Sequence, residues 1–308
     1  MKFSQDNLIL ILPTLNAGEK LKVWLDAFLK QTVKPKNLLV IDSSSNDCTV
    51  ELMKENGFNV QVIGRDSFNH GGTRQMGIEM FPFGAVVIFL TQDAILADEY
   101  AIENILKCFK NDKVGVAYGR QLPHLESGVI GAHARVFNYS DKSTLKSFSD
   151  AKNLGIKTAF ISNSFAAYRM EALLAVGGFP RHTILGEDTY VAAKMLLGDW
   201  KIQYCAEAKV YHSHDYNYIE EFKRYFDIGV FHVRESWIRE KFGQAEGEGL
   251  KFVLSEVKYL FKQRKVNLLP SAFFRTFLKY LGYRLGANER KLPLYLKKRM
   301  SMHWRYWK

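Results

Sequence analysis

Short runs of apolar residues that end at polar side chains recur along the first two-thirds of the chain. Residues 86–90 are all apolar, and they lead into Thr91, Gln92 and Asp93. An unbroken apolar run of this length is typical of a strand buried on both faces, as in the interior of a parallel sheet. Further strands are predicted at residues 8–12, 38–41, 60–63, 114–118, 201–204 and 208–211, which are rich in apolar residues.

Segments with helical spacing of apolar residues separate these predicted strands. Residues 21–29 follow the first strand, and a predicted helix over 48–56 ends at Gly57, which suits the position after a helix. A further helix is expected at 187–197. This alternation predicts an α/β fold with a doubly wound, mostly parallel sheet. Residues 122–157 show no clear period and are expected to form a long loop.

Charge divides the chain near residue 215. Residues 1–215 carry equal numbers of basic and acidic side chains, whereas residues 216–308 carry 20 Lys and Arg against 9 Asp and Glu. The whole net charge of +11 therefore lies in the last third, where apolar residues recur at helical spacing. We expect an α/β domain over 1–215 and a basic, amphipathic helical region over 216–308.

Composition limits the class of protein. The hydrophobic fraction is 47%, which is that of a globular protein, and no apolar run reaches the roughly 18 residues that span a bilayer. The polar N-terminus does not resemble a secretory signal. Three widely separated cysteines indicate reduced thiols in a cytoplasmic protein, without a disulfide framework or a zinc site.

Three explanations of the basic region are possible: a membrane surface, solvent-exposed helix faces, or nucleic acid. Its charge and aromatic residues fit an anionic membrane surface, but ordinary solvated helix faces explain them equally well. Nucleic acid is disfavoured because no binding motif is present. Residues 287–308 are expected to be removable without loss of the fold.

Polar side chains stand at the ends of several predicted strands, and in a parallel sheet these ends share one edge. Asp93 together with a histidine would suit Mn²⁺ or Mg²⁺, and such a metal neutralises charge on a diphosphate. Arg65 and Arg74 could pair with phosphate oxygens, and Asp188 could accept a proton from a hydroxyl. The other strand-end residues are Thr14, Asn16, Asp42, Arg120, His212 and His214.

Each of these residues also has a simpler interpretation. Asp42 can cap the next helix, Gly71 and Gly72 can form a tight turn, and Glu187 and Asp188 suit the start of any helix. The histidines can be solvated. A dinucleotide-dependent oxidoreductase is disfavoured because the turn after the first strand lacks the Gly-rich pattern. Only the ordered set of strand-end residues favours a site.

That ordered set resembles family 2 glycosyltransferases, which have the GT-A fold. Residues 11–16 resemble the family's opening strand and turn, and residues 40–49 resemble its VVDDGSTDxT segment, with Ser43 in place of the second Asp. Residues 176–179 and 186–189 resemble its GGF…ED pair. The likeness covers residues 6–215. Within the family it is closest to bacterial rhamnosyltransferases of cell-surface polysaccharide synthesis, through residues 68–74, 90–94, 118–123, 137–139 and 211–214.

The resemblance implies an inverting transfer of a sugar to a hydroxyl of a lipid-linked polysaccharide, with dTDP-L-rhamnose as donor. It implies an enzyme on the cytoplasmic face of the membrane. Asp188 would be the catalytic base and Glu187 its positioning neighbour. The nucleotide-binding residues would be Thr14, Asn16, Asp42, Arg65, Arg74 and Gln92. The metal ligands for Mn²⁺ or Mg²⁺ would be Asp93, His212 and His214.

One departure from the family pattern concerns the metal. The DxD motif reads Thr91-Gln92-Asp93, so a single carboxylate remains, and we expect weak, nucleotide-dependent metal binding. Gln75 stands where many relatives have Asn. The alternative is a non-catalytic nucleotide-sugar-binding scaffold of a polysaccharide assembly complex, against which the retained Glu187 and Asp188 count.

Overall fold

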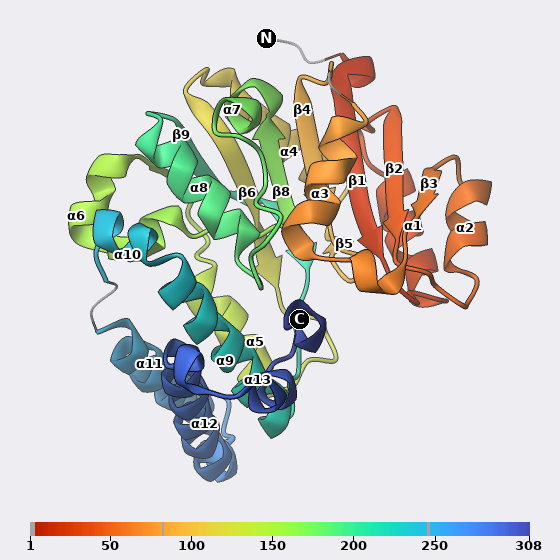
Figure 1. Cartoon of the computed structure of the whole chain (residues 1–308). Helices are drawn as coiled ribbons and strands as arrows, with labels where there is room; N and C mark the ends of the chain where they lie inside the picture. Colours follow the sequence, from red (N-terminus) through yellow and green to blue (C-terminus); the bar gives the residue numbers. More distant parts are fainter. Residues whose placement is uncertain (1–3, 82, 245–246) are drawn as a thin grey trace.

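A mixed sheet of nine strands forms the centre of the computed structural model, which describes residues 4–81, 83–244 and 247–308. Its first half is parallel throughout, with the order β3-β2-β1-β4 (Figure 1). The bounds are β1 (Leu8–Thr14), β2 (Asn37–Asp42), β3 (Asn59–Val62) and β4 (Val86–Leu90).

The second half of the sheet mixes strand directions. β8 lies antiparallel between β4 and β6, while β6 and β9 run parallel to each other. β5 and β7 pair with β9 in antiparallel fashion. The predicted α/β class with a mostly parallel sheet is confirmed, with β8 inserted against the main direction. The bounds are β5 (Ile95–Leu96), β6 (Val114–Leu122), β7 (Thr144–Lys146), β8 (Phe165–Arg169) and β9 (Lys201–Tyr211).

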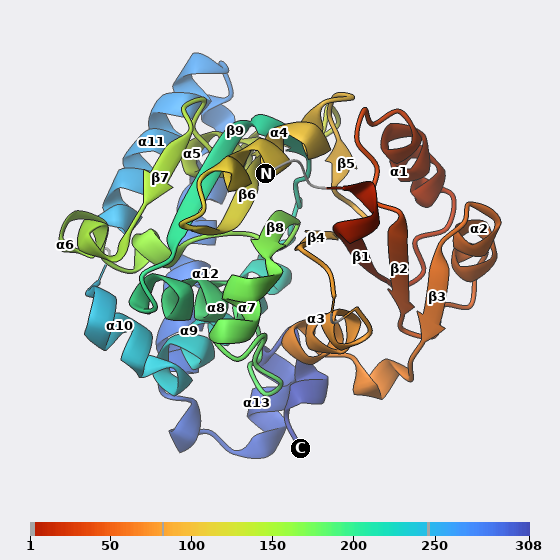
Figure 2. The same cartoon turned by 90° about the horizontal axis from the view of Figure 1, so that it is seen from above.

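Helices cover both faces of the sheet, as Figure 2 shows from above. Alternate residues of β1 point to opposite faces, so Leu10 packs with α1 and α4 while Ile11 packs with α3 and α8. All of the side chains of β4 are buried, which explains its unbroken apolar pattern. The bounds are α1 (Lys20–Leu29), α2 (Thr49–Glu55), α3 (His70–Glu79), α4 (Ala101–Lys107), α7 (Met170–Ala175) and α8 (Glu187–Leu197).

The prediction that residues 122–157 form a long loop is wrong. This segment contains α5 (Val129–Asn138), β7 and α6 (Ala151–Leu154). His133 of α5 is buried against α11 (Glu248–Lys262). A polar residue on the buried face of α5 interrupts the apolar spacing by which this helix would be recognised. The two short strands predicted at 201–204 and 208–211 are one strand, β9, whose pairing with β6 shifts register beside Gly119.

Helices make up the basic region, as expected. Its bounds are α9 (Tyr218–Arg234), α10 (Ser236–Phe242), α11 (Glu248–Lys262), α12 (Leu269–Ala287) and α13 (Leu294–Met300). Helices α9 and α12 pack closely because Gly286 lies directly on the Phe226 backbone, where an added Cβ would meet the Phe226 carbonyl oxygen at 1.9 Å. No helix within the described ranges is both long and apolar enough to cross a membrane.

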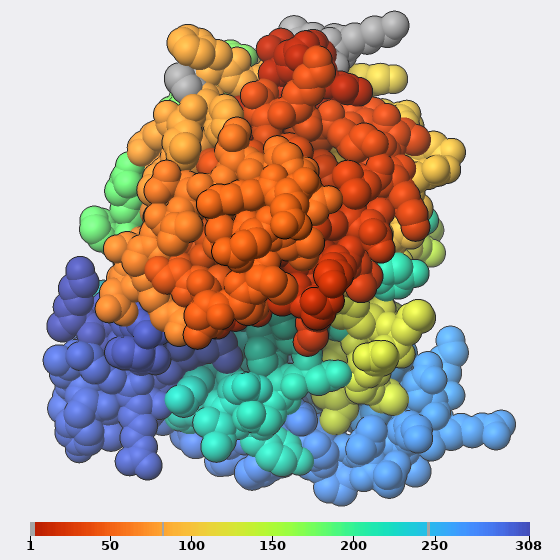
Figure 3. All heavy atoms as spheres, turned by 90° about the vertical axis from the view of Figure 1, so that its right-hand side faces the viewer, coloured from red at the N-terminus to blue at the C-terminus, as the bar shows by residue number. Residues whose placement is uncertain are grey.

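The C-terminal segment packs into the molecule and is not a detachable tail. Trp307 belongs to the same hydrophobic cluster as Phe226 and the sheet residue Ile11. Asp227 accepts hydrogen bonds from the backbone N–H groups of Met302 and His303, at 2.9 and 3.2 Å. We therefore expect that removal of residues 287–308 destabilises the fold, contrary to the expectation from the sequence. Figure 3 shows the helical region (blue) lying against the N-terminal half (red to orange).

Candidate active site

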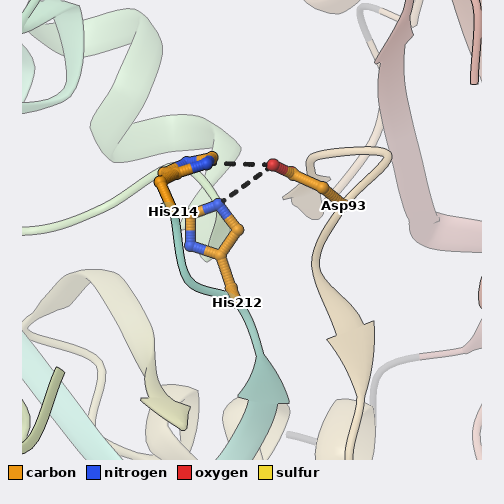
Figure 4. A group of neighbouring side chains, drawn as sticks. All are labelled: Asp93, His212 and His214. Carbon is orange, nitrogen blue, oxygen red and sulfur yellow. Dashed lines mark ion pairs between the residues drawn. The ribbon is translucent and has the colours of Figure 1, made fainter. Parts of the chain in front are cut away.

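Three predicted metal ligands meet beyond the carboxyl ends of β4 and β9. Asp93 Oδ2 lies 3.4 Å from His212 Nε2 and 3.8 Å from His214 Nε2 (Figure 4). One ligand atom from each of the three residues lies within 4.8 Å of the others. Strand order brings these residues together, because β4 and β9 both deliver their following loops to this edge.

The hydrogen bonding of His212 favours a cation at this position. Its Nδ1 lies 2.9 Å from Oε1 of the buried Gln121, whose Nε2 donates to Ser162 Oγ at 2.8 Å. Because the Gln121 oxygen can only accept, Nδ1 carries the hydrogen and the other nitrogen, Nε2, faces the Asp93 carboxylate. A neutral imidazole would then set a lone pair against a carboxylate, so a proton or a metal ion is needed between them.

Burial decides between the proton and the metal. It lowers the pKa of His212, and it lowers the pKa of His214 to about 4, which disfavours imidazolium at neutral pH. One carboxylate oxygen and two neutral imidazole nitrogens form a donor set that fits a divalent transition ion. The group can therefore hold a metal. Gln121, which fixes the His212 ring, was not assigned a role from the sequence, although it lies in the 118–123 stretch.

The second centre lies at the start of α8. Glu187 is buried. Its Oε1 forms an ion pair with Nη1 of Arg74 at 3.1 Å and accepts a hydrogen bond from Nδ2 of Asn163 at 3.0 Å. Burial alone would raise the pKa of Glu187, but Arg74, His70 and the Asn163 hydrogen bond outweigh it and lower this pKa. Glu187 is therefore ionised.

Asp188 titrates differently from its neighbour. Burial, together with the charge of Glu187, raises the pKa of Asp188 to about 7. The Thr189 N–H donates to its Oδ1 at 2.7 Å and the Asn163 N–H to its Oδ2 at 3.4 Å. Two adjacent carboxylates with pKa values driven apart are typical of acid–base sites, and a pKa near 7 suits a general base at neutral pH.

A short segment before β8 joins the two centres. Asn163 contacts both Glu187 and Asp188, and the Oγ atom of the next residue, Ser164, lies 3.5 Å from His212 Nε2. The Thr91 N–H donates to the Ser164 carbonyl at 3.3 Å, close to Asp93. Asp93 and Asp188 thus lie on the same edge of the sheet. Asn163 and Ser164 were not selected from the sequence because neither follows a predicted strand.

The loops after β1 and β2 are tied together through Asp42. Its fully buried carboxylate accepts the Thr14 hydroxyl at 2.8 Å and the Ser45 hydroxyl at 2.6 Å. The Asn16 N–H in turn donates to Ser45 Oγ at 2.8 Å, and Asn16 adopts the left-handed φ of 46° that Asn tolerates. Asp42 therefore acts through Thr14 and Ser45, because protein groups already occupy its oxygens.

Two predicted nucleotide-binding residues have other partners. Arg74 is buried, pairs with Glu187 and donates to the His70 carbonyl at 2.9 Å, so we reassign it from the diphosphate to the Glu187 centre. Gln92 accepts from the Leu15 N–H at 2.7 Å and donates to the Leu15 carbonyl at 3.0 Å. Gln92, the middle residue of the Thr91-Gln92-Asp93 motif, therefore joins the loop after β1 to the loop that carries Asp93.

Arg65 remains available for a phosphate group. It is exposed after β3 and forms no hydrogen bond or ion pair within the described part of the chain.

The Gly177-Gly178-Phe179 turn is held by Gln75. The Gln75 side-chain oxygen accepts the Phe179 N–H at 2.8 Å, and a Cβ at Gly178, where φ is +70°, would meet Gln75 Oε1 at 2.1 Å. Gly178 is therefore required by close approach as well as by backbone conformation.

Comparisons with known proteins agree with this geometry. Residues 9–177 match the family described as Glycosyl transferase family 2. The chain is 48% identical over 299 residues to the O-antigen chain rhamnosyltransferase WbaN of Salmonella anatum, covering 97% of this chain and 95% of the relative. It is 49% identical over 300 residues, with the same coverage, to the O-antigen chain rhamnosyltransferase RfbN of Salmonella typhimurium (strain LT2).

Solved structures share the fold at low identity. The mannosyltransferase PcManGT from Pyrobaculum calidifontis, in complex with GDP-Man and Mn²⁺, matches with a TM-score of 0.61 and 16% identity over 92% of this chain and 86% of that chain. S. aureus TarS 1–349 in complex with UDP-GlcNAc matches with a TM-score of 0.52 and 14% identity over 92% of this chain and 91% of that chain. The chain therefore belongs to glycosyl transferase family 2 and is a glycosyltransferase, acting between a nucleotide-sugar donor and a glycan acceptor.

Proposed function

We propose that this enzyme transfers L-rhamnose from dTDP-L-rhamnose to a hydroxyl of a growing, lipid-linked cell-surface polysaccharide. The observation that carries the proposal is identity of 48–49% over nearly the full length to two relatives named O-antigen chain rhamnosyltransferases. The presence of both Glu187 and Asp188, with pKa values shifted in opposite directions, supports catalysis over a purely binding role.

Asp188 is the base of the proposed reaction. As the acceptor hydroxyl oxygen bonds to the anomeric carbon, its proton passes to the Asp188 carboxylate, and the bond from that carbon to the diphosphate oxygen breaks. A single displacement of this kind inverts the anomeric centre. Burial, together with the charge of Glu187 that Arg74 stabilises, holds the pKa of Asp188 near 7, so Asp188 is a base at neutral pH and can release the proton afterwards.

Thr14 and Asn16 form the wall that faces the nucleoside. Asp42 orders Thr14 directly and orders Asn16 through Ser45. Arg65 is the exposed cation on the nucleotide side of the same edge. Asp93, His212 and His214 hold Mn²⁺ or Mg²⁺, and the mannosyltransferase PcManGT was solved with Mn²⁺. When bound, such an ion neutralises charge on the departing diphosphate.

We also place the enzyme on the inner face of the cell membrane, held by its basic helices. The connection between α11 and α12 exposes Phe261 and Val266 next to Lys262, Arg264 and Lys265. Figure 1 shows these two helices reaching far from the sheet. Apolar side chains among basic ones fit an anionic lipid surface, where a lipid-linked acceptor would be found.

A donor panel tests the proposed function. The full chain is incubated with several nucleotide sugars, an acceptor-bearing membrane fraction and Mn²⁺, and release of nucleoside diphosphate is followed. We expect dTDP-L-rhamnose to react fastest, and Asp188→Asn to slow turnover by about a hundredfold to ten-thousandfold while dTDP still binds.

Faster turnover of another donor would replace the proposed sugar. Unchanged turnover in Asp188→Asn would remove this residue as the base. Tight binding of dTDP-L-rhamnose without turnover of any donor would instead support the non-catalytic scaffold.

A further inference from the structure

Phe179, the aromatic residue of the Gly177-Gly178-Phe179 turn, packs against a tyrosine that the sequence did not single out. Tyr168 lies on β8 and is fully buried, and its ring meets the Phe179 ring edge to face with centroids 5.4 Å apart. Phe89 of β4 meets the same ring edge to face at 5.7 Å. A ring enclosed in this way cannot turn aside, so the two phenylalanines fix the direction in which the Tyr168 hydroxyl points.

The Tyr168 hydroxyl sets the orientation of the buried Asn163 side chain. It donates to Asn163 Oδ1 at 2.6 Å, and burial raises the pKa of Tyr168 well above its ordinary value, so the hydroxyl keeps its proton. Since an amide accepts at its oxygen and donates at its nitrogen, Asn163 Nδ2 is turned toward Glu187 Oε1, 3.0 Å away. A rotated amide would set its oxygen against the Glu187 carboxylate, where neither group can donate.

Asn163 also reaches Asp188, through its main chain. Its N–H donates to Asp188 Oδ2 at 3.4 Å, while its Nδ2 and the Nη1 atom of Arg74 both bind Glu187 Oε1. One residue thus contacts both carboxylates, and together with Arg74 it keeps Glu187 ionised and fixed in place. Of these contacts of Asn163, a side-chain substitution removes the one to Glu187.

The charge of Glu187 matters for the chemistry of its neighbour. Burial and then the charge of Glu187 raise the pKa of Asp188 to about 7, while Arg74 acts in the opposite direction. The other titratable groups that face the two carboxylates are His70 on α3, Tyr139 on α5 and Tyr168 on β8. Burial lowers the pKa of the histidine and raises those of the two tyrosines, so all three are neutral at neutral pH.

We infer that Asn163 and Tyr168 are positioning residues of the transfer reaction, in which Tyr168 fixes the Asn163 amide and the amide holds Glu187 in the place from which its charge acts on Asp188. The inference rests on the proposed function, in which Asp188 is the base. It also gives the Gly177-Gly178-Phe179 turn a role, because Phe179 holds the Tyr168 ring. Both residues act on the reaction through the two carboxylates, so their loss lowers kcat and leaves donor affinity unchanged.

Steady-state kinetics of the full chain, with Mn²⁺ and the donor that the parent turns over fastest, test this assignment. Asn163→Ala removes a hydrogen bond to an ionised group, so kcat should fall by about tenfold to a hundredfold. Tyr168→Phe removes one neutral hydrogen bond, so kcat should fall by about threefold to tenfold, and the donor KM should stay that of the parent in both variants. The matched control is Tyr204→Phe, which removes a buried tyrosine hydroxyl bonded to the Ser140 carbonyl at 2.6 Å and should keep the parent kcat.

A double-mutant cycle separates positioning from ordinary packing. If Tyr168 acts through the Asn163 amide, Tyr168→Phe lowers kcat in the parent but changes it by less than about twofold when Asn163→Ala is already present. A hydroxyl that matters for packing alone would change kcat equally in both backgrounds. Circular dichroism and melting temperature check the fold, and Asn163→Leu, which keeps a similar volume, replaces Asn163→Ala if that variant does not fold.

The pH–rate profile gives a second readout. Loss of the Asn163 hydrogen bond raises the pKa of Glu187, so this group loses its charge earlier as the pH falls and stops raising the pKa of Asp188. The acid midpoint of kcat/KM should therefore move to lower pH in Asn163→Ala, in the same direction as in Glu187→Gln. Adding Asn163→Ala to Glu187→Gln should move it no further.

The inference and the proposed function fail in different ways. Parent-like kcat and an unmoved midpoint in Asn163→Ala and Tyr168→Phe, in a chain where Asp188→Asn abolishes turnover, overturn the inference alone. Equal loss of kcat on Tyr168→Phe in both backgrounds does the same. A parent that turns over no donor, or an Asp188→Asn variant as active as the parent, overturns the proposed function and this inference with it. A sugar donor other than dTDP-L-rhamnose leaves the inference standing.

Discussion

At the scale of single residues, the site depends on pairs of similar groups placed in different environments. Glu187 and Asp188 are adjacent in sequence, yet Arg74 and Asn163 make the first a fixed charge while burial and that charge make the second a base with a pKa of about 7. His212 differs from His214 in the same way, because only His212 is oriented by Gln121. Partner choice, more than residue type, sets the chemistry.

The pH dependence follows from the raised pKa of Asp188. Below about pH 7 its carboxyl is protonated and cannot accept a proton, so kcat/KM should fall with decreasing pH, with a midpoint near 7. Glu187→Gln removes a charge that raises this pKa, so the midpoint should move to lower pH. A pH–rate profile of each protein, with melting temperature as a check on folding, measures this.

The pH dependence of folding stability gives an independent test of the raised pKa of Asp188. A carboxyl whose pKa is higher in the folded than in the unfolded state opposes folding once the pH exceeds its unfolded value, and the cost is complete above the folded value. Asp188→Asn should therefore raise the melting temperature relative to the parent at pH 8 and much less at pH 4. Equal effects at both pH values would contradict the raised pKa.

Gln121 should control metal affinity without touching the metal. Gln121→Leu removes the acceptor that fixes Nδ1 of His212, and loss of a hydrogen bond that orients a metal-binding histidine typically costs about tenfold to a hundredfold in metal affinity. Titration of Mn²⁺ in the presence of dTDP measures the change, and Gln61→Leu on the exposed face of β3 is the control. Equal Mn²⁺ affinity in both variants, with the fold intact, would remove Gln121 from this role.

At the scale of elements, strand direction and helix ends decide where side chains arrive. The insertion of antiparallel β8 between β4 and β6 places Asn163 and Ser164 next to the Asp93 loop and the start of α8. The α11 and α12 pair leaves apolar and basic side chains exposed.

Membrane binding can be tested on that pair alone. Phe261→Ser with Val266→Ser should weaken sedimentation with vesicles containing anionic phospholipid by at least about tenfold, because each exposed apolar side chain loses its burial in the interface. Binding of the parent should fall as salt is raised. The control replaces Val23 and Leu29, which are exposed on α1, by Ser. Unchanged sedimentation of the first variant would show that another surface makes the contact.

At the scale of the whole molecule, the basic helices and the sheet domain share a core. Trp307 and Phe226 join the cluster that contains Ile11, and Arg305 pairs with Asp66 at 2.6 Å. The ring of His303 lies against His70, with centroids 4.9 Å apart, so the chain's end forms part of the wall beside the Glu187 centre. The change of charge near residue 215 thus marks a change of surface and secondary structure, while the apolar packing continues across it.

The sequence by itself determined the elements whose signals are local. Buried strands, capped helices, the basic last third and the family motifs are all readable from neighbouring residues, and they sufficed to place Asp93, His212, His214, Glu187 and Asp188 at strand and helix ends. Tertiary structure decided which groups are partners: Arg74 with Glu187, Gln92 with Leu15, and Gln121 with His212. It also decided the direction of β8 and the helix hidden in 122–157. The physical reason is that hydrophobic periodicity repeats within a few residues, whereas ion pairs and buried hydrogen bonds join residues far apart in the chain.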